Sequence, residues 1–184
     1  MIADAQLAST APDNKGKAVV AFMNPGGIRA DIVASQSSGG EAAGQVTYSE
    51  LFTVQPFANV MTVLTLTGAQ IKALLEQQFD NPSAGQTRFL QVSNGFTYSY
   101  KLNAPAGQHV DAASIKLNGV AVDPGASYRV AENNFLATGG DNFTVFKQGT
   151  NQLGGDIDLD ALVAYFQAKS PIAPGPQNRF TRTD

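Results

Sequence analysis

Two glycine-rich corners carry the side chains best suited to bind a ligand. The first, Asn24-Pro25-Gly26-Gly27-Ile28-Arg29, places an amide and a guanidinium around a turn, which suits an anion or the polar edge of a base. In the second, Gly139-Gly140-Asp141, the glycines allow close backbone approach and Asp141 can accept hydrogen bonds from hydroxyls. Ordinary surface turns, with an arginine ion pair or a capping aspartate, have the same composition, so both interpretations stay open at this point.

Neither corner has the sequence of a familiar phosphate-binding loop. Gly26-Gly27 is not followed by Lys-Ser/Thr, and Gly139-Gly140 is not part of a G-x-G-x-x-G motif. This excludes the usual NTPase and dinucleotide-binding sites.

Two phenylalanines stand in turn-like surroundings, where a core aromatic is less expected. Phe57 follows Pro56, and Phe135 follows two asparagines. Their position would allow them to stack on a flat ligand, while ordinary packing is the alternative.

Other residues offer little for metal or acid–base chemistry. Without cysteine and with His109 as its single histidine, one copy of the chain cannot build a thiolate site or a centre that needs several imidazoles. Asp156, Asp158 and Asp160 are spaced like the start of a calcium loop, but the loop's later glycine and glutamate are missing. We therefore expect Asp158 to cap a helix and His109 to be a solvated loop residue.

Composition restricts the class of protein further. The 184 residues carry a net charge of −3, and only 15% are charged, so neither a nucleic-acid polymer nor an anionic membrane is an expected partner. The longest apolar runs are too short for a membrane span, and the N-terminal residues do not resemble a signal peptide. The length favours a single domain over residues 1–184.

The hydrophobic pattern predicts interleaved strands and helices. Thr47-x-x-Glu50 and Thr67-x-x-Gln70 are capping boxes that start helices at Tyr48 and Gly68. Asn118-Gly119 predicts a hairpin turn within residues 114–122. Further strands are expected at 17–23, 59–66, 95–102 and 127–131, and helices at 2–7 and 159–168.

Together these segments resemble the C-terminal domain of the 5'-nucleotidase family. The resemblance is carried by their order along nearly the whole chain. The segments are Ile2-Ala3-Asp4-Ala5, residues 24–29, Pro56-Phe57, Thr67-Gly68, Phe89-Leu90-Gln91-Val92-Ser93, residues 134–143 and Arg179-Phe180. The resemblance implies an α+β fold in a four-layer α-β-β-α arrangement, with mixed sheets covered by helices.

The same resemblance implies a role for each candidate residue. Phe57 and Phe135 would sandwich a nucleobase, and Asp141 would bind the ribose hydroxyls. Asn24 would lie near the base and Arg29 would face the phosphate, with Gly26 and Gly27 forming the corner between them. The implied ligand is a nucleotide or nucleoside.

Catalysis would belong to another part of the polypeptide. In this family an N-terminal metallophosphoesterase domain holds two divalent metals, so the resemblance implies a periplasmic, secreted or cell-surface phosphohydrolase. It also implies that this chain, which lacks that domain, is inactive alone and holds no cofactor. A UDP-sugar hydrolase, a 2',3'-cyclic-nucleotide phosphodiesterase and a non-catalytic nucleoside-binding or interaction module are the alternatives.

Three departures from the family pattern affect these expectations. Pro25 and Asn142 stand where glycine is frequent, and the upstream segment with a phosphate-binding arginine is missing. Proline removes a backbone N–H that would otherwise be able to face a ligand.

Overall fold

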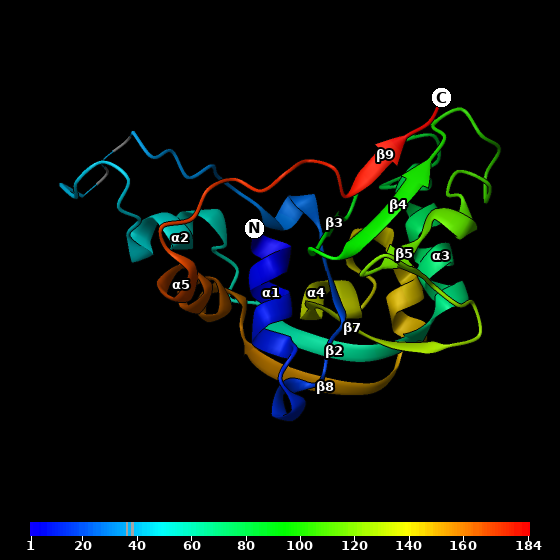
Figure 1. Cartoon of the computed structure of the whole chain (residues 1–184), viewed down its shortest axis with the longest axis horizontal. Coiled ribbons are helices and arrows are strands. Elements are labelled where there is room, and N and C mark those ends of the chain that lie inside the picture. The colour runs from blue at the N-terminus through cyan, green and yellow to red at the C-terminus, as the bar shows by residue number, and fades with distance from the viewer. Residues whose placement is uncertain (36, 38) are drawn as a thin grey trace.

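The chain folds around two mixed β-sheets. The computed structural model describes residues 1–35, 37 and 39–184. One sheet has the strand order β3-β1-β7-β2-β8 and the other the order β6-β5-β4-β9, and each contains parallel and antiparallel pairs. In Figure 1, β2 and β8 lie together on one side of the molecule, and β4 and β9 lie on the opposite side. The strands are β1 (Val20–Met23), β2 (Val60–Thr67), β3 (Gln91–Val92), β4 (Phe96–Tyr100), β5 (Lys116–Leu117), β6 (Val120–Ala121), β7 (Ser127–Asn133), β8 (Thr150–Ile157) and β9 (Phe180–Arg182).

Helices cover the first sheet and fill the space beside the second. They are α1 (Ile2–Thr10), α2 (Tyr48–Val54), α3 (Gly68–Glu76), α4 (Asn134–Ala137) and α5 (Asp158–Lys169). Helix α1 packs through Ala3 on Met23 and Met61, and through Ala5 on the apolar faces of α2 and α5. Figure 1 shows α2 and α5 side by side next to α1. The predicted α+β class with mixed, helix-covered sheets is thus confirmed.

The main core lies between the two sheets. Phe22 of β1 meets Phe96 of β4 edge to face at 5.5 Å between ring centroids, and α3 adds Leu74 and Leu75 to the same cluster. Because these residues are almost fully buried, this cluster joins the two sheets through the hydrophobic effect.

Local signals in the sequence predict most elements correctly. Both capping boxes form: the Thr47 and Thr67 hydroxyls accept from the third helical N–H, and Glu50 and Gln70 accept from the N-cap N–H. The Asn118-Gly119 turn joins β5 to β6, with both residues at positive φ as such a turn requires.

Several boundaries differ from the prediction; helix α1, for example, continues to Thr10 and does not end at residue 7. Strand β1 begins at Val20 and not at residue 17, because Gly16 and Lys17 have left-handed φ values of 116° and 58°. Helix α5 begins at Asp158 itself, so Ile157 is the N-cap, and the Asp158 carboxylate accepts a backbone bond from the adjacent Leu159 N–H. The expected capping role of Asp158 is therefore wrong by one position.

Strand β8 has no counterpart in the prediction. Most of it is exposed, and its Gly154-Gly155 pair lacks the alternation typical of a strand. It forms because β2 supplies the ladder, with Val63 opposite Leu153 and Thr65 opposite Thr150. Among the described residues, no helix has both the length and the apolarity needed to cross a membrane.

Asp4 ties α1 to the distant C-terminal segment. Arg179 donates from both terminal nitrogens to the two Asp4 oxygens at 2.7 Å, and the Asn94 N–H donates at 2.7 Å. Burial raises the pKa of Asp4, but these bonds lower it more, so its pKa lies below the usual value. The Ile-Ala-Asp start is thus a structural anchor in this chain.

Candidate functional site

Asp141 is held by three residues from two separate segments, Asn24 on one and Asn81 and Arg88 on the other. Arg88 Nη1 lies 2.8 Å from Asp141 Oδ1, and Asn24 Nδ2 donates to Asp141 Oδ2 at 2.8 Å. The Asn81 side-chain amide donates to the Asp141 backbone carbonyl. Among the described residues, each carboxylate oxygen therefore has one donor, which leaves one of its two lone pairs for a ligand.

The loop around Asp141 has an unusual backbone. Gly139, Asp141 and Asn142 have φ values of 85°, 51° and 60°, all in the left-handed region. Asn and Asp adopt this region more readily than other non-glycine residues, so Asn142 can replace the glycine that the resemblance predicts there.

The first glycine corner packs directly against Asp141. Pro25 occupies the first position of a 3₁₀ turn, Pro25–Gly27, where its fixed φ and missing N–H cost little. A Cβ on Gly26 would lie 3.4 Å from Asp141 Oδ2, and one on Gly27 would lie 2.5 Å from Met23 Cε. Gly26 thus lets the corner approach the carboxylate, while Gly27 is buried and serves packing.

Asn24 connects this corner to the aromatic segment. Its side chain is 3% exposed, and its Oδ1 accepts from Asn133 Nδ2 at 3.0 Å. Asn133 in turn caps α4, because its Oδ1 accepts from the Leu136 N–H at 2.9 Å. In this structure Asn24 orients Asp141 and α4, and it is too buried to present much surface to a base.

Phe135 projects from α4 and is 42% exposed. A Cβ on Gly140 would lie only 2.5 Å from Phe135 Cε1. Glycine is therefore needed at position 140 to let the ring rest on the loop that carries Asp141.

Phe57 and Arg29 form the other half of the site. The guanidinium carbon of Arg29 lies 5.9 Å from the centroid of the Phe57 ring, within cation–π range, and Arg29 Nη1 donates to the Gly26 carbonyl at 3.2 Å. Phe57 is 54% exposed. Arg29 has no carboxylate partner among the described residues, and its charge remains available to an anion.

Hydrogen bonds connect the segments that carry the two halves. The Asn134 side chain accepts from the Val60 N–H at 2.9 Å, which joins the segment after Phe57 to the helix of Phe135. The Arg29 N–H donates to the Val54 carbonyl at 2.9 Å, which joins the first corner to α2. Phe57 and Phe135 are therefore presented by connected segments, outside the hydrophobic core.

Arg88 and Asn81 are absent from the residues that the sequence predicts for the site. The structure adds both because they bind Asp141, which lies more than 50 residues farther along the chain. The position of Arg88 just before the segment Phe89–Ser93 is the one signal that points to this region.

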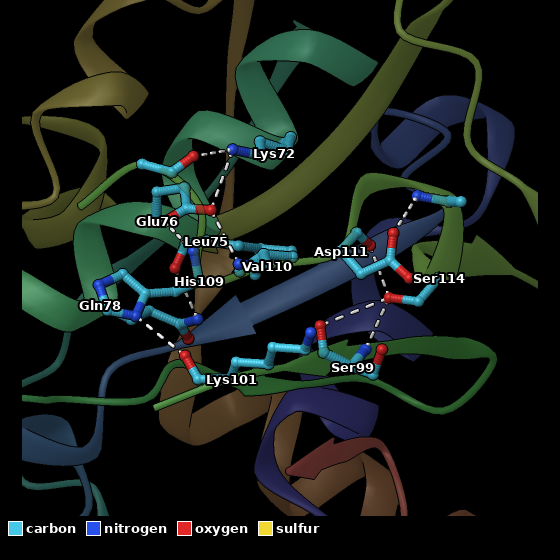
Figure 2. Close-up of polar contacts among 12 residues, drawn as sticks. Lys72, Leu75, Glu76, Gln78, Ser99, Lys101, His109, Val110, Asp111 and Ser114 are labelled. Carbon is cyan, nitrogen blue, oxygen red and sulfur yellow. Dashed lines mark hydrogen bonds and ion pairs between the residues drawn. The ribbon is translucent and has the colours of Figure 1, made fainter. Parts of the chain in front are cut away.

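His109 and the aspartates of the calcium-like segment are used structurally. The His109 ring stacks on Phe79 at 4.1 Å and is half-buried, so the expectation of a solvated histidine is wrong. Figure 2 shows how the loop that carries His109 is held in place. Glu76, which pairs with Lys72, accepts hydrogen bonds from the backbone N–H groups of His109 and Val110.

The aspartates also have protein partners. Asp156 pairs with Lys15 at 2.8 Å, and Asp158 accepts from Asn59 Nδ2 at 3.1 Å. Burial raises the pKa of Asp158, despite the hydrogen bonds that lower it. Across the described part of the chain, no three His, Cys, Asp or Glu side chains group in a way that would hold a metal ion.

The chain is similar in sequence to a known protein family and to several known proteins. Residues 1–148 match the family described as "5'-nucleotidase, C-terminal domain". Over 153 residues the chain is 40% identical to the trifunctional nucleotide phosphoesterase protein YfkN of Bacillus subtilis, covering 82% of this chain and 10% of YfkN. It is 33% identical over 170 residues to the cell wall protein Lmo0130 of Listeria monocytogenes, covering 91% of this chain and 20% of that protein.

A solved structure extends the similarity to the fold. The 5'-nucleotidase precursor of Thermus thermophilus superposes with a TM-score of 0.78 at 33% identity, covering 98% of this chain and 34% of that chain. The chain thus spans about a tenth to a third of the length of these three proteins.

Proposed function

This chain belongs to the 5'-nucleotidase family, in which it corresponds to the C-terminal domain, and from that premise we propose that it binds the nucleoside part of a nucleotide substrate. The base stacks between Phe57 and Phe135, and the ribose hydroxyls donate to Asp141. The protein as a whole is a 5'-nucleotidase-type phosphohydrolase.

One observation carries this proposal. Two large aromatic rings, 54% and 42% exposed, lie on segments joined by a hydrogen bond, and the ring of Phe135 rests on the loop of a carboxylate whose two oxygens each have one donor among the described residues. Exposed rings suit the flat faces of a base, and two acceptor positions suit the adjacent hydroxyls of a ribose.

Arg29 supplies a cation for the phosphate side of the nucleotide. It lies over the Phe57 ring, is exposed, and has no carboxylate partner in the described part of the chain. A guanidinium in this position can donate to phosphate oxygens while the ring beneath it stacks on the base. Arg29→Met should therefore weaken AMP binding more than adenosine binding.

Hydrolysis takes place with groups that this chain does not provide. The resemblance implies two metals that would activate water, but the described residues contain no group able to hold a metal ion. We propose on the ground of the resemblance that residues 1–184 position the nucleotide and that phosphate is released only together with the metal-holding part of the polypeptide. Metal-dependent phosphate release from AMP by the purified chain would contradict this assignment.

The binding proposal is tested by titrating the chain with AMP and following backbone amide resonances. We expect dissociation constants on the order of millimolar, because the surface lacks an opposing domain that would close over the ligand. Phe57→Ala and Phe135→Ala should each weaken binding at least about fivefold, since a base–aromatic stack contributes about 1–3 kcal/mol.

Phe52→Ala is the matched control. Phe52 is 48% exposed on α2, so the substitution removes a similarly exposed ring that has no role in the proposed site. It should leave the AMP dissociation constant within about twofold of the parent value. Equal effects of all three substitutions, or no binding by the parent chain, would reject the proposal.

We also propose that the protein works at the cell surface or outside the cell. The similarity to a protein named for the Listeria cell wall supports this location. Detection of the full protein in the cytoplasmic fraction alone would contradict it.

A further inference from the structure

We propose that Arg88 is a positioning residue that orients the Asp141 carboxylate and thereby makes the site select ribose over 2'-deoxyribose. This inference rests on the proposed function, because it concerns the sugar of the bound nucleotide. It assigns a role to a residue that lies outside both glycine corners and both aromatic segments.

The contact between Arg88 and Asp141 is direct and partly shielded from solvent. Nη1 of Arg88 lies 2.8 Å from Oδ1, and the two side chains are 31% and 17% exposed. Asn24 holds the other oxygen, Oδ2, at 2.8 Å. With one donor on each oxygen, the carboxylate plane is fixed, because rotation about the side chain would break at least one of the two bonds.

Arg88 lies on a loop that two buried side chains hold in place through hydrogen bonds. Gln78 is fully buried, its backbone carbonyl accepts from the Arg88 N–H at 2.8 Å, and its side-chain oxygen accepts from the Leu90 N–H at 2.8 Å. Asn81 is also fully buried, and its N–H donates to the Gln86 carbonyl at 3.0 Å while its side chain binds the Asp141 carbonyl. One loop therefore fixes both the backbone of Asp141 and the cation at its carboxylate.

The orientation of the carboxylate decides what it can bind. Two adjacent hydroxyls need two acceptor positions facing the same way, and the fixed carboxylate offers one free lone pair on each oxygen. Without Arg88, the carboxylate is held by Asn24 alone and is able to turn about Oδ2. The carboxylate would then still accept a hydrogen bond from one hydroxyl, but its other oxygen would no longer be held in position for the second hydroxyl.

A purely structural role for Arg88 makes a different prediction. If Arg88 only stabilised the loop, its loss would shift Phe135 and Asp141 together, and every ligand that stacks on the rings would weaken by the same factor. A positioning role changes the preference between two sugars, because the stacked base is the same in both ligands.

The test compares AMP with 2'-deoxy-AMP on the parent chain, Arg88→Met and Arg182→Met. Arg182 is the matched control, because it pairs with Asp184 at 2.9 Å at an exposed site on β9. In the parent and in Arg182→Met we expect AMP to bind about tenfold more tightly than 2'-deoxy-AMP, as one hydrogen bond to a charged group allows. In Arg88→Met the ratio should fall to about twofold or less, with the 2'-deoxy-AMP dissociation constant within about twofold of the parent value.

Each other outcome overturns the inference in a recognisable way. An unchanged ratio in Arg88→Met, or equal weakening of both ligands, rejects the positioning role while leaving nucleotide binding intact. Failure of the parent to bind either ligand rejects the proposed function itself. A thermal midpoint close to that of the parent, measured for each variant, shows that the comparison is made on folded protein.

Discussion

Two of the aspartate–arginine pairs in the described part of the chain, Asp4–Arg179 and Asp141–Arg88, are nearly equal in length but differ in their settings. Asp4 accepts from both Arg179 terminal nitrogens, from the Asn94 N–H and from the Met1 amino group at 3.1 Å, so its roughly four acceptor positions are filled. The Asp141 carboxylate, within the described part of the chain, accepts from Arg88 and Asn24 alone. The Asp4–Arg179 pair therefore connects two parts of the fold, whereas the Asp141–Arg88 pair leaves two acceptor positions of the carboxylate open.

The backbone repeats this difference. Asp4 sits within a regular helix, whereas Asp141 has a left-handed φ of 51° in a glycine-rich loop beside exposed rings. Left-handed non-glycine residues cost free energy and tend to persist where a function requires them. Counting the donors already bound to a carboxylate therefore separates a structural pair from a candidate ligand site.

The largest effect should come from breaking the Asp4–Arg179 pair, whose carboxylate has its acceptor positions occupied. Arg179→Met leaves Asp4 without its main partner at a site where both side chains are mostly buried, 17% and 13% exposed. We expect a loss of about 3 kcal/mol in the free energy of unfolding, measured with urea at neutral pH. The AMP dissociation constant of the folded protein should stay within about twofold of the parent value.

The pH dependence of that loss follows from the lowered pKa of Asp4. A carboxyl with a lower pKa in the folded state stabilises the protein above its unfolded pKa of about 3.9, and this contribution disappears as the pH falls through the folded value. The gap between parent and Arg179→Met should thus narrow below about pH 4. Arg182 is exposed, so an equal loss of stability in Arg182→Met would contradict the structural role of the Asp4–Arg179 pair. A difference between the parent and Arg179→Met that stays constant at all pH values would contradict it as well.

The second largest effect should come from the Asp141–Arg88 pair. A change there should alter the AMP dissociation constant more than the free energy of unfolding. Asp141→Asn removes the charge that accepts ligand hydroxyls, and a hydrogen bond to a charged group contributes about 1.5–3 kcal/mol. AMP should therefore bind at least about tenfold more weakly, as measured by titration. The free energy of unfolding should fall by about 1 kcal/mol or less, because the Arg88 pair is partly exposed.

Asp184→Asn is the control for Asp141→Asn, since Asp184 pairs with Arg182 at the surface. It should leave AMP binding unchanged, and it serves as a control for binding only, because Asp184 also accepts from the backbone N–H groups of Leu102 and Asn103. If Asp141→Asn behaved like Arg179→Met, with a large loss of stability and unchanged binding, the two pairs would be equivalent and the comparison would fail.

A smaller effect is expected from the loop that joins Asp141 to Phe135. Gly140→Ala would place a Cβ 2.5 Å from both the Phe135 ring and the Phe135 backbone carbonyl oxygen, so the ring and the loop beside it must shift. We expect AMP binding to weaken about fivefold, or about 1 kcal/mol, because the base loses part of its stack. Gly154→Ala, whose Cβ would meet only Val60 Cγ1 at 3.9 Å, should leave binding unchanged.

The parts of the fold that the sequence predicts correctly are those set by short-range chemistry. Thr47 and Glu50, Thr67 and Gln70, and Asn118-Gly119 interact over a few residues, so their patterns are visible in the sequence itself. Strand β8 depends on pairing with β2, which lies far away in the chain, and has little strand propensity of its own. Its existence follows from the tertiary structure and not from local preference.

The candidate site shows the same division. Asn24, Arg29 and Asp141 stand in glycine corners that the sequence makes visible, although their roles toward a ligand stay predictions. Arg88 has no local motif, because its partner Asp141 comes from a distant loop. Residues that position a site residue are therefore harder to predict than the residue that they position.

A third carboxylate, Glu132, has no hydrogen-bond donor at all within the described part of the chain. Glu132 on β7 is fully buried, and neither of its oxygens has a hydrogen-bond partner among the described residues. Burial therefore raises its pKa well above the usual value, against a smaller lowering by Arg129.

A raised carboxyl pKa in the folded state lowers stability as the pH rises above the unfolded pKa of about 4.3, because the unfolded chain releases its proton first. Glu132→Gln removes this charge while it keeps the size of the side chain. The variant should match the parent near pH 4 and exceed its free energy of unfolding by about 1 kcal/mol at neutral pH. Urea titrations at both pH values would measure the difference. A variant less stable than the parent at neutral pH would mean that the Glu132 carboxylate has a hydrogen-bond partner in solution. Glu132 would then no longer be an example of a carboxylate without donors.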